Sequence, residues 1–286
     1  MQSAALIFAT CVSLPGITPD DQPLADALMS LGVEVRPLPW TEIAPDASLP
    51  VLLRSTWDYY LSGPRFEGWL QALEAAGTRV INPAPVARWN MDKRYLLELE
   101  AAGVAIPPTL MAHGFDGAGL RTALEARGWS TAVVKPRVSA TAHGTLVVRA
   151  GEAIPEAGLE PASNAGALIQ AFVPEILEQG ELSLVYLGGQ YSHAVRKRAR
   201  PSDFRVQSDH GGTVEAASPS AASRALGDRA VSAAPGSCLY ARVDLVETSR
   251  GPVLMELELI EPELFFLHAP AAAMQCARLL RSMLAS

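Results

Sequence analysis

Short apolar runs alternate with amphipathic segments through the first 85 residues of the chain. Four of the runs have the length and flanking residues of buried β-strands, and they are Ala4–Ala9, Val33–Val35, Val51–Leu53 and Arg79–Ile81. Leu24–Leu31 and Phe66–Ala76 have apolar residues at helical spacing, and a glycine directly follows each of them, as is common at helix ends. Strands that alternate with helices predict a parallel sheet with crossover helices.

The rest of the chain predicts further helices together with antiparallel hairpins. The expected helices are Met91–Ala102 with Asn90 as its cap, Gly119–Arg127, Ser220–Ala234 and Ala269–Leu284. The expected single strands are one beginning near Thr109, then Thr131–Pro136, Thr145–Arg149 and Ala167–Val173. The expected hairpins are Glu181–Leu187 with Gln190–Ala199, and Leu239–Thr248 with Pro252–Ile260. Gly151–Gly166 and Asp203–Gly212 are predicted to be loops.

These patterns divide the chain into three units, which are 1–85, 86–166 and 167–286. The run Asn82-Pro83-Ala84-Pro85 marks the first boundary, and the predicted loop Gly151–Gly166 marks the second. The first unit is of the α/β class with a parallel, Rossmann-like sheet, and the two later units are α+β.

Composition and charge narrow the possible functions. The 286 residues carry a formal net charge of −7, which gives nucleic-acid binding no general electrostatic support. No run of about 18 apolar residues occurs, so no membrane span is expected. The apolar start of the chain has no basic residue before Arg36, and it therefore predicts a strand rather than a secretory signal. Three widely separated cysteines fit a reducing cytoplasm.

An acidic hairpin near the C-terminus is the clearest candidate for chemistry. Glu256 and Glu258 share one face of the predicted strand, and a hairpin symmetric about Arg250 places Asp244 opposite Glu256. Arg242 then lies opposite Glu258. Carboxylates paired across strands repel each other, and a divalent cation bound by oxygen ligands, Mg²⁺ or Mn²⁺, would relieve that repulsion. A solvated acidic face with an Arg242–Glu258 salt bridge is the alternative.

Three basic positions suit phosphate oxygens. Lys135 ends an apolar strand and is followed by a loop of small residues, whose backbone N–H groups can approach a ligand closely. Lys93 lies in the first turn of the predicted helix capped by Asn90. In the basic run that begins at Arg196, we expect Lys197 and Arg205 to face a cleft. Surface-exposed lysines and arginines with no ligand are the alternative for each position.

Taken in order, these pieces resemble the ATP-grasp superfamily across most of the chain. Besides the residues named above, the resemblance rests on Ile169-Gln170-Ala171-Phe172-Val173-Pro174 and on Gly180-Glu181-Leu182-Ser183. The layout is similar to that of prokaryotic glutathione synthetases. Arg54-Ser55-Thr56-Trp57-Asp58-Tyr59 and the run from Glu256 to Phe266 are more similar to the cyclo-ligases that close the D-cycloserine ring from O-ureido-D-serine.

The resemblance implies a site for ATP and two Mg²⁺ ions, with Mn²⁺ as a possible replacement. Lys93 and Lys135 would hold the phosphates, and a loop including Ser139, His143, Gly144 and Thr145 would fold over them. Adenine would be read by Gln170, Ala171, Phe172 and Val173, and ribose by Glu181, with Glu178 as the second choice. Asp244, Glu256 and Glu258 would hold the metal. The catalytic positions would be Arg205, which would stabilise the transferred phosphoryl group, and Lys197. Many relatives have Glu-x-Asn where this chain has Glu256-x-Glu258, so the metal geometry is open.

The expected activity is an ATP- and Mg²⁺-dependent ligase that activates a small amino-acid-like carboxylate as an acyl phosphate and forms a C–N bond. Arg54, Ser55 and Asp58 follow a strand and are expected to bind the substrate, together with Glu261 beside the metal site. Ligation between two molecules and ring closure within one both remain open. A phosphotransferase and a non-catalytic ATP-binding regulatory paralogue are the alternative functions. Dimers are usual in such families, so a homodimer is possible.

Overall fold

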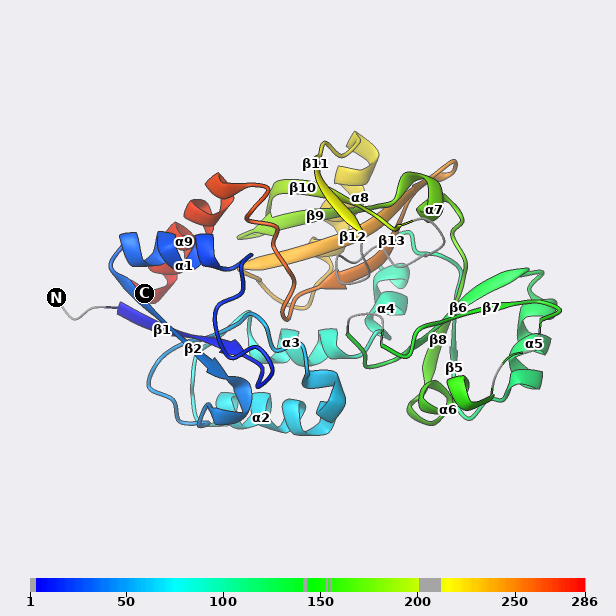
Figure 1. Cartoon of the computed structure of the whole chain (residues 1–286), viewed down its shortest axis with the longest axis horizontal. Coiled ribbons are helices and arrows are strands. Elements are labelled where there is room, and N and C mark those ends of the chain that lie inside the picture. The colour runs from blue at the N-terminus through cyan, green and yellow to red at the C-terminus, as the bar shows by residue number, and fades with distance from the viewer. Residues whose placement is uncertain (1–3, 141–142, 153, 155, 201–211, 286) are drawn as a thin grey trace.

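A computed structural model describes residues 4–140, 143–152, 154, 156–200 and 212–285 (Figure 1). Within these residues, no helix is long and apolar enough to cross a membrane. The strands form three sheets, with the parallel sheet of the N-terminal residues at one end of the molecule and a small antiparallel sheet at the other. A larger antiparallel sheet lies between them in the view of Figure 1.

The N-terminal sheet confirms the predicted parallel arrangement. Its strand order is β2-β1-β3-β4, with β1 at Ala4–Thr10, β2 at Val33–Pro39, β3 at Val51–Leu53 and β4 at Val80–Ile81. Leu6 and Phe8 on one face pack against α1 (Gln22–Ser30) and the last helix, α9 (Pro270–Ala285). Ile7 and Ala9 on the other face pack against α2 (Gly63–Ala75) and α3 (Ala84–Met91). The C-terminal helix thus completes the core of the N-terminal sheet.

The small sheet combines three strands of the predicted central unit with the first strand of the third unit. Its order is β5-β8-β6-β7, with β5 at Thr109–Ala112, β8 at Ala167–Ala171, β6 at Thr131–Pro136 and β7 at Leu146–Arg149. The sheet packs against α5 (Gly117–Ala126) and α6 (Glu156–Ala165). The prediction of a loop over Gly151–Gly166 is therefore wrong. The segment contains Gly158 and Pro161, which disfavour helix interiors, but Leu159 and Ala162 are buried in the core of this sheet.

The large sheet is antiparallel throughout and contains both predicted hairpins. Its order is β11-β10-β9-β12-β13, with β11 at Thr213–Ala217, β10 at Gln190–Arg198, β9 at Glu181–Leu187, β12 at Tyr240–Thr248 and β13 at Gly251–Glu258. Its apolar face packs against α8 (Ala221–Ser232) and α4 (Tyr95–Ala101). Strand β11 and the short helix α7 (Glu175–Gln179) were not predicted. Both are short, and several of their residues are exposed, so apolar residues do not recur at strand or helix spacing in them.

The predicted helix Met91–Ala102 is shorter, because α4 covers only Tyr95–Ala101. Met91 instead ends α3, a helix that was not predicted, and residues 92–94 separate the two helices. Asn90 lies inside α3 and does not cap a helix. Its buried amide donates to the Leu257 carbonyl and accepts from the Leu259 N–H, each at 2.8 Å, and so ties α3 to the end of β13. Asp92 is extended, and Lys93 follows it in the break. Lys93 is therefore outside the first turn of a helix.

A β-bulge sets which side of β13 faces the site. The register pairs Leu245 with Leu254 and then Asp244 with Glu256, so Met255 is the extra residue on β13. Leu254 packs into the apolar core on one side of the bulge, and Leu257 packs into the same core on the other side. The bulge therefore inverts the alternation of faces and turns Glu256 and Glu258 away from that core.

Asn82 should be a strong determinant of stability. Its side chain is fully buried, donates to the carbonyls of Tyr240 and Leu259, and accepts from the Leu239 N–H at 2.7 Å. Replacement by alanine leaves three buried backbone groups without a partner. We expect Asn82→Ala to lower the free energy of unfolding by about 3 kcal/mol or more, because each such group costs about 1–3 kcal/mol. Urea denaturation measures the change.

The control for that experiment is Asn164→Ala in α6, where the side chain is exposed. A change of less than about 0.5 kcal/mol is expected there. Equal effects of the two substitutions would show that the buried amide does not tie the sheets together.

Candidate functional site

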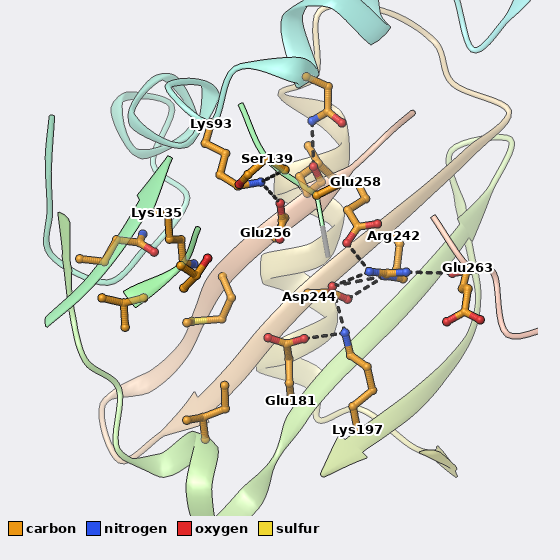
Figure 2. Close-up of a pocket in the computed structure, with 18 of the residues that line it drawn as sticks. Lys93, Lys135, Ser139, Glu181, Lys197, Arg242, Asp244, Glu256, Glu258 and Glu263 are labelled. Atoms are coloured by element: carbon orange, nitrogen blue, oxygen red, sulfur yellow. Dashed lines mark hydrogen bonds and ion pairs between the residues drawn. The ribbon is translucent and has the colours of Figure 1, made fainter. Parts of the chain in front are cut away.

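A polar pocket lies between the small sheet and the large sheet, and residues 57–59 and 260–265 close one end of it. Figure 2 shows that its charged side chains come from both sheets and from the break between α3 and α4. The chain contains only three lysines, Lys93, Lys135 and Lys197, and all three line this pocket. The other basic residues of the chain are arginines and histidines. The scarcity of lysine is visible in the sequence and could itself have pointed to these three positions as a site.

Two of these lysines are bound to carboxylates of the predicted metal site. Lys93 Nζ lies 2.5 Å from Glu256 Oε1 and also donates to the Ser139 carbonyl at 3.0 Å. Lys197 Nζ lies 2.6 Å from Glu181 and 3.1 Å from Asp244 Oδ2. Each ammonium is nearly buried, so each pair is shielded from water. The neighbouring carboxylates hold the pKa values of both lysines above the ordinary value, although burial opposes that shift.

Lys135 is different because it has no hydrogen-bond or ion-pair partner among the described residues. Burial lowers its pKa. Figure 2 shows its side chain in the pocket, beside the small sheet, with no contact drawn to its ammonium group. A half-buried cation without a direct ion-pair partner is poorly solvated. An anion at this position, such as a phosphate, would complete the site.

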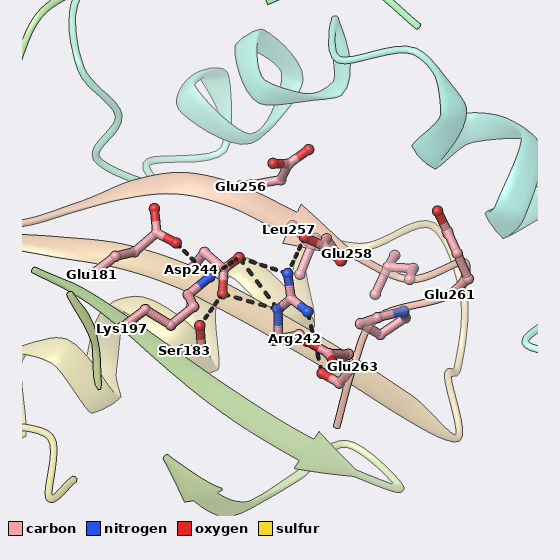
Figure 3. Close-up of polar contacts among 12 residues, drawn as sticks. Glu181, Ser183, Lys197, Arg242, Asp244, Glu256, Leu257, Glu258, Glu261 and Glu263 are labelled. Carbon is pink, nitrogen blue, oxygen red and sulfur yellow. Dashed lines mark hydrogen bonds and ion pairs between the residues drawn. The ribbon is translucent and has the colours of Figure 1, made fainter. Parts of the chain in front are cut away.

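The predicted pairings across the hairpin are confirmed, with Asp244 opposite Glu256 and Arg242 opposite Glu258. The expectation that the carboxylates mainly repel is wrong, because cations separate them. Arg242 lies 3.0 Å from Asp244 Oδ2 and also contacts Glu258, as Figure 3 shows. Although Asp244 is buried, Arg242 and Lys197 hold its pKa well below the usual range. Burial raises the pKa of Glu258 to about 7 despite Arg242.

No group of three acidic, histidine or cysteine side chains within the described ranges is arranged to hold a metal ion. The available donors are nevertheless oxygens only, the type that Mg²⁺ prefers. Glu256 and Glu258 are partly exposed to the pocket and are held only by cations. These carboxylates would be free to bind magnesium if the phosphates of a polyphosphate paired with Lys93 and Arg242 instead.

The adenine end of the predicted site has free hydrogen-bonding groups. Gln170 donates to Thr109 Oγ1 at 2.9 Å, but its Oε1 is buried without a partner. The N–H groups of Ala171 and Phe172 donate to the Pro108 and Thr131 carbonyls, whereas the Val173 N–H has no partner among the described residues. These free groups at the pocket wall fit the edge of a purine base.

Of the two acidic residues considered for ribose, only one reaches the pocket. Glu181 is buried in the pocket lining, and burial raises its pKa although Lys197 contacts it. Glu178 is exposed on α7 and does not line the pocket. The geometry therefore favours the first choice over the second.

The predicted phosphate loop reaches the pocket in part. Ser139 and Thr145 line it, whereas His143 is exposed and stacks on Tyr60, with 4.9 Å between the ring centroids. Gly144 has a φ of 69°, next to Pro136, and is not part of the lining. Arg205 lies outside the described residues.

The structure does not bring Arg54, Ser55 and Asp58 to the pocket. The Arg54 guanidinium is 2% exposed and pairs with Asp21 at 2.6 Å. Ser55 is buried, and Asp58 accepts a hydrogen bond from the Trp40 indole at 2.7 Å. From this string, Trp57 and Tyr59 line the pocket instead. Strand alternation could not have found them, because residues 57 and 58 form a turn and a 3₁₀-helix, η2 (Tyr59–Ser62), follows.

Arg54 and Trp57 hold the segment 260–265, which forms the acidic end of the pocket. Four consecutive carbonyls of this segment accept hydrogen bonds from side chains: Ile260 from Tyr240, Glu261 from Trp57, Pro262 from Arg54 and Glu263 from Arg242. Asp20 accepts from the next two N–H groups, those of Leu264 and Phe265. Arg242 was expected only as a salt-bridge partner, yet it also lines the pocket and contacts three acidic residues.

Two family models match the chain. One, described as the N-terminal domain of D-cycloserine synthetase DcsG, matches residues 6–82, and the other, the RimK-like ATP-grasp domain, matches residues 96–263. The cycloserine biosynthesis protein DcsG of Streptomyces lavendulae is 31% identical over 293 residues, which cover 96% of each chain. The crystal structure of D-cycloserine synthetase DcsG superposes with a TM-score of 0.85 at 27% identity, covering 98% of this chain and 100% of that one.

A more distant relative from Serratia proteamaculans is named a probable alpha-L-glutamate ligase. It is 30% identical over 195 residues, which cover 66% of this chain and 62% of the relative.

Lys135 should be needed for ligand binding but not for folding. Lys135→Met keeps the apolar part of the side chain and removes a half-buried ammonium that has no ion-pair partner among the described residues. We expect the thermal midpoint of the free protein to stay the same or rise, while the increase caused by ATP is lost. Turnover should fall on the order of 10²-fold or more, because a cation is removed from a poorly hydrated phosphate site.

Thermal melting with and without ATP measures this effect, and Arg127→Met on the surface is the control. A normal ATP-dependent shift in Lys135→Met would exclude Lys135 from the phosphate site.

Proposed function

Because this chain belongs to the ATP-grasp ligases, with the RimK-like domain and the DcsG-type N-terminal domain, we propose that it closes a ring within a small amino-acid derivative. ATP-dependent formation of a C–N bond is the activity of the family. The proposed substrate is O-ureido-D-serine or a close relative. The observation that carries the proposal is the end-to-end similarity to DcsG, which includes the N-terminal domain, whereas the glutamate ligase matches only about two thirds of the chain.

The proposed reaction has two steps. A carboxylate oxygen of the substrate attacks the γ-phosphorus of ATP, the bond to the bridging oxygen breaks, and ADP leaves. The resulting acyl phosphate has a good leaving group, so a nitrogen of the same molecule attacks the acyl carbon and expels phosphate as the C–N bond forms. This chemistry needs charge neutralisation and exclusion of water rather than a protein nucleophile.

We assign the residues of the pocket to this reaction as follows. Lys93, Lys135 and Lys197 bind the phosphates, and Arg242 and Arg205 stabilise the charge that develops on the transferred phosphoryl group. Gln170 and the backbone of Ala171–Val173 bind adenine, and Glu181 binds ribose. Asp244, Glu256 and Glu258 hold the magnesium, for which we propose two ions, with Mn²⁺ able to replace them. When bound, the metal neutralises phosphate charge.

The ion pairs of the free pocket imply that nucleotide and metal bind together. ATP alone would draw Lys93 and Lys197 away from their carboxylates, and Mg²⁺ alone would displace the cations from the same carboxylates. When both bind, cations face phosphates and carboxylates face metal, so each charge keeps a partner of opposite sign.

Glu256→Gln tests this exchange. We expect the free protein to lose about 1–2 kcal/mol of stability, because Lys93 loses a partly buried partner and the pair is partly screened by solvent. The extra thermal stability that ATP and Mg²⁺ confer together should also disappear. Melting with Mg²⁺ alone, ATP alone and both measures the two effects, and Glu34→Gln, in an exposed pair, is the control. An undiminished joint shift would remove Glu256 from the metal site.

The activity itself is tested by ADP release over a panel of O-ureido-D-serine, D-alanine and L-glutamate. We expect release with O-ureido-D-serine and a cyclised product by mass spectrometry. Hydroxylamine should divert part of the reaction to a hydroxamate, because it traps an acyl phosphate. ADP release with a stable phosphorylated product would favour the phosphotransferase, and ATP binding without release on any substrate would favour the non-catalytic protein.

A further inference from the structure

Glu261 is a buried carboxylate without a cationic partner at the acidic end of the pocket. Its side chain lines the pocket, the residue is 8% exposed, and no ion pair to it occurs in the described part of the chain. The nearby cations are engaged elsewhere, because Lys93 binds Glu256 and Arg242 binds Asp244 and Glu258. Figure 3 shows Glu261 apart from the Arg242 network, with no contact drawn to its carboxylate.

A buried carboxyl group that faces a pocket either stays protonated or pairs with a cation that enters the pocket. Burial raises the pKa of Glu261 to about 8, and a bound cation would stabilise its ionised form. Trp57, Tyr59 and Phe265 line the same pocket. An ammonium group carries three donors and a positive charge, so it complements a carboxylate in such a place. A second carboxylate would instead face Glu258, Glu261 and Glu263, and like charges at close range are strongly unfavourable.

The position of Glu261 is fixed by the backbone around it. Trp57 Nε1 donates to its carbonyl at 3.0 Å, and Arg54 donates to the next carbonyl, that of Pro262, at 2.9 Å. Phe265 has a φ of 53°, the only positive value at a non-glycine residue in the described ranges. Such a conformation persists only where its surroundings hold it, and here Asp20 accepts from the Phe265 N–H at 3.0 Å.

We infer that Glu261 binds the ammonium group of the substrate, and that Arg54 and Trp57 are positioning residues for it. The inference rests on the proposed function and adds the residue that recognises the amine of the substrate and that disfavours a dicarboxylate such as glutamate. It also assigns a role to the Arg54–Tyr59 string, which reaches the substrate through the backbone of the acidic segment as well as through Trp57 and Tyr59.

The test combines a change in the protein with a change in the ligand, as in a double-mutant cycle. Dissociation constants are measured by calorimetry, with magnesium and a non-hydrolysable ATP analogue present, for wild type and Glu261→Gln. The ligands are O-ureido-D-serine and the same molecule without its amine. Loss of the amine should weaken binding to wild type about 10²-fold but binding to Glu261→Gln less than about 3-fold. L-glutamate should bind Glu261→Gln better than wild type. Glu100→Gln, exposed on α4, is the control.

Trp57→Phe tests the positioning role, because it keeps an aromatic ring and removes the indole donor. The dissociation constant of O-ureido-D-serine should rise about 10-fold, while those of the amine-free analogue and of the nucleotide should not change. A merely structural role would move all three.

Several outcomes overturn the inference. If loss of the amine weakens binding equally in wild type and Glu261→Gln, Glu261 does not bind the ammonium. If that result comes with normal ADP release by wild type, the inference fails and the proposed function stands. If no amino acid in the panel binds to wild type or supports ADP release, both fail.

Discussion

Burying four cations beside a set of carboxylates costs solvation free energy, and mutual neutralisation is what makes such an arrangement stable. Lys93, Lys197 and Arg242 each pair with a carboxylate, whereas Lys135 has no ion-pair partner among the described residues. Four cations and six carboxylates line the pocket, so acidic groups are in excess. Under the proposed function, a triphosphate would enter with a metal ion, and the existing ion pairs would be exchanged for pairs of cation with phosphate and of carboxylate with metal.

The positions of these charged groups depend on side-chain hydrogen bonds between elements, and not on the helices and strands alone. The amides of Asn82 and Asn90 join α3 and the N-terminal domain to strands β12 and β13. The segment after β13 has no ladder partner, yet four of its carbonyls are bound in sequence by Tyr240, Trp57, Arg54 and Arg242. Side chains thus hold a segment without secondary structure in place, and Arg242 connects this segment to Asp244 and Glu258.

The parts of this picture that follow local patterns could be predicted from the sequence. The parallel N-terminal sheet follows from alternating short runs and helices. Symmetry about Arg250 predicted Asp244 opposite Glu256, but the turn itself pairs Thr248 with Gly251, a register that would place Asp244 opposite Met255. The bulge at Met255, which was not foreseen, brings Glu256 opposite Asp244. Local patterns failed where tertiary contacts decide. Asn90 looked like a helix cap, but its amide binds a distant strand, and α6 forms across Gly158 and Pro161 because Leu159 and Ala162 are buried. Likewise, repulsion between Asp244 and Glu256 was inferred within one hairpin, because Lys93 and Lys197, which pair with these carboxylates, come from other parts of the chain.

The placement of all three lysines in one pocket has a consequence for how this protein meets amine-directed chemistry. Most proteins carry many ε-amines on their surface, so acylating reagents, cross-linkers and lysine-modifying enzymes act on them far from any active site. Here all three lysines line one pocket, so an acylating reagent reaches an ε-amine only by entering that pocket. If the pocket binds ATP as proposed, acylation of lysine would compete with the nucleotide, and a bound nucleotide would protect every lysine in the chain at once.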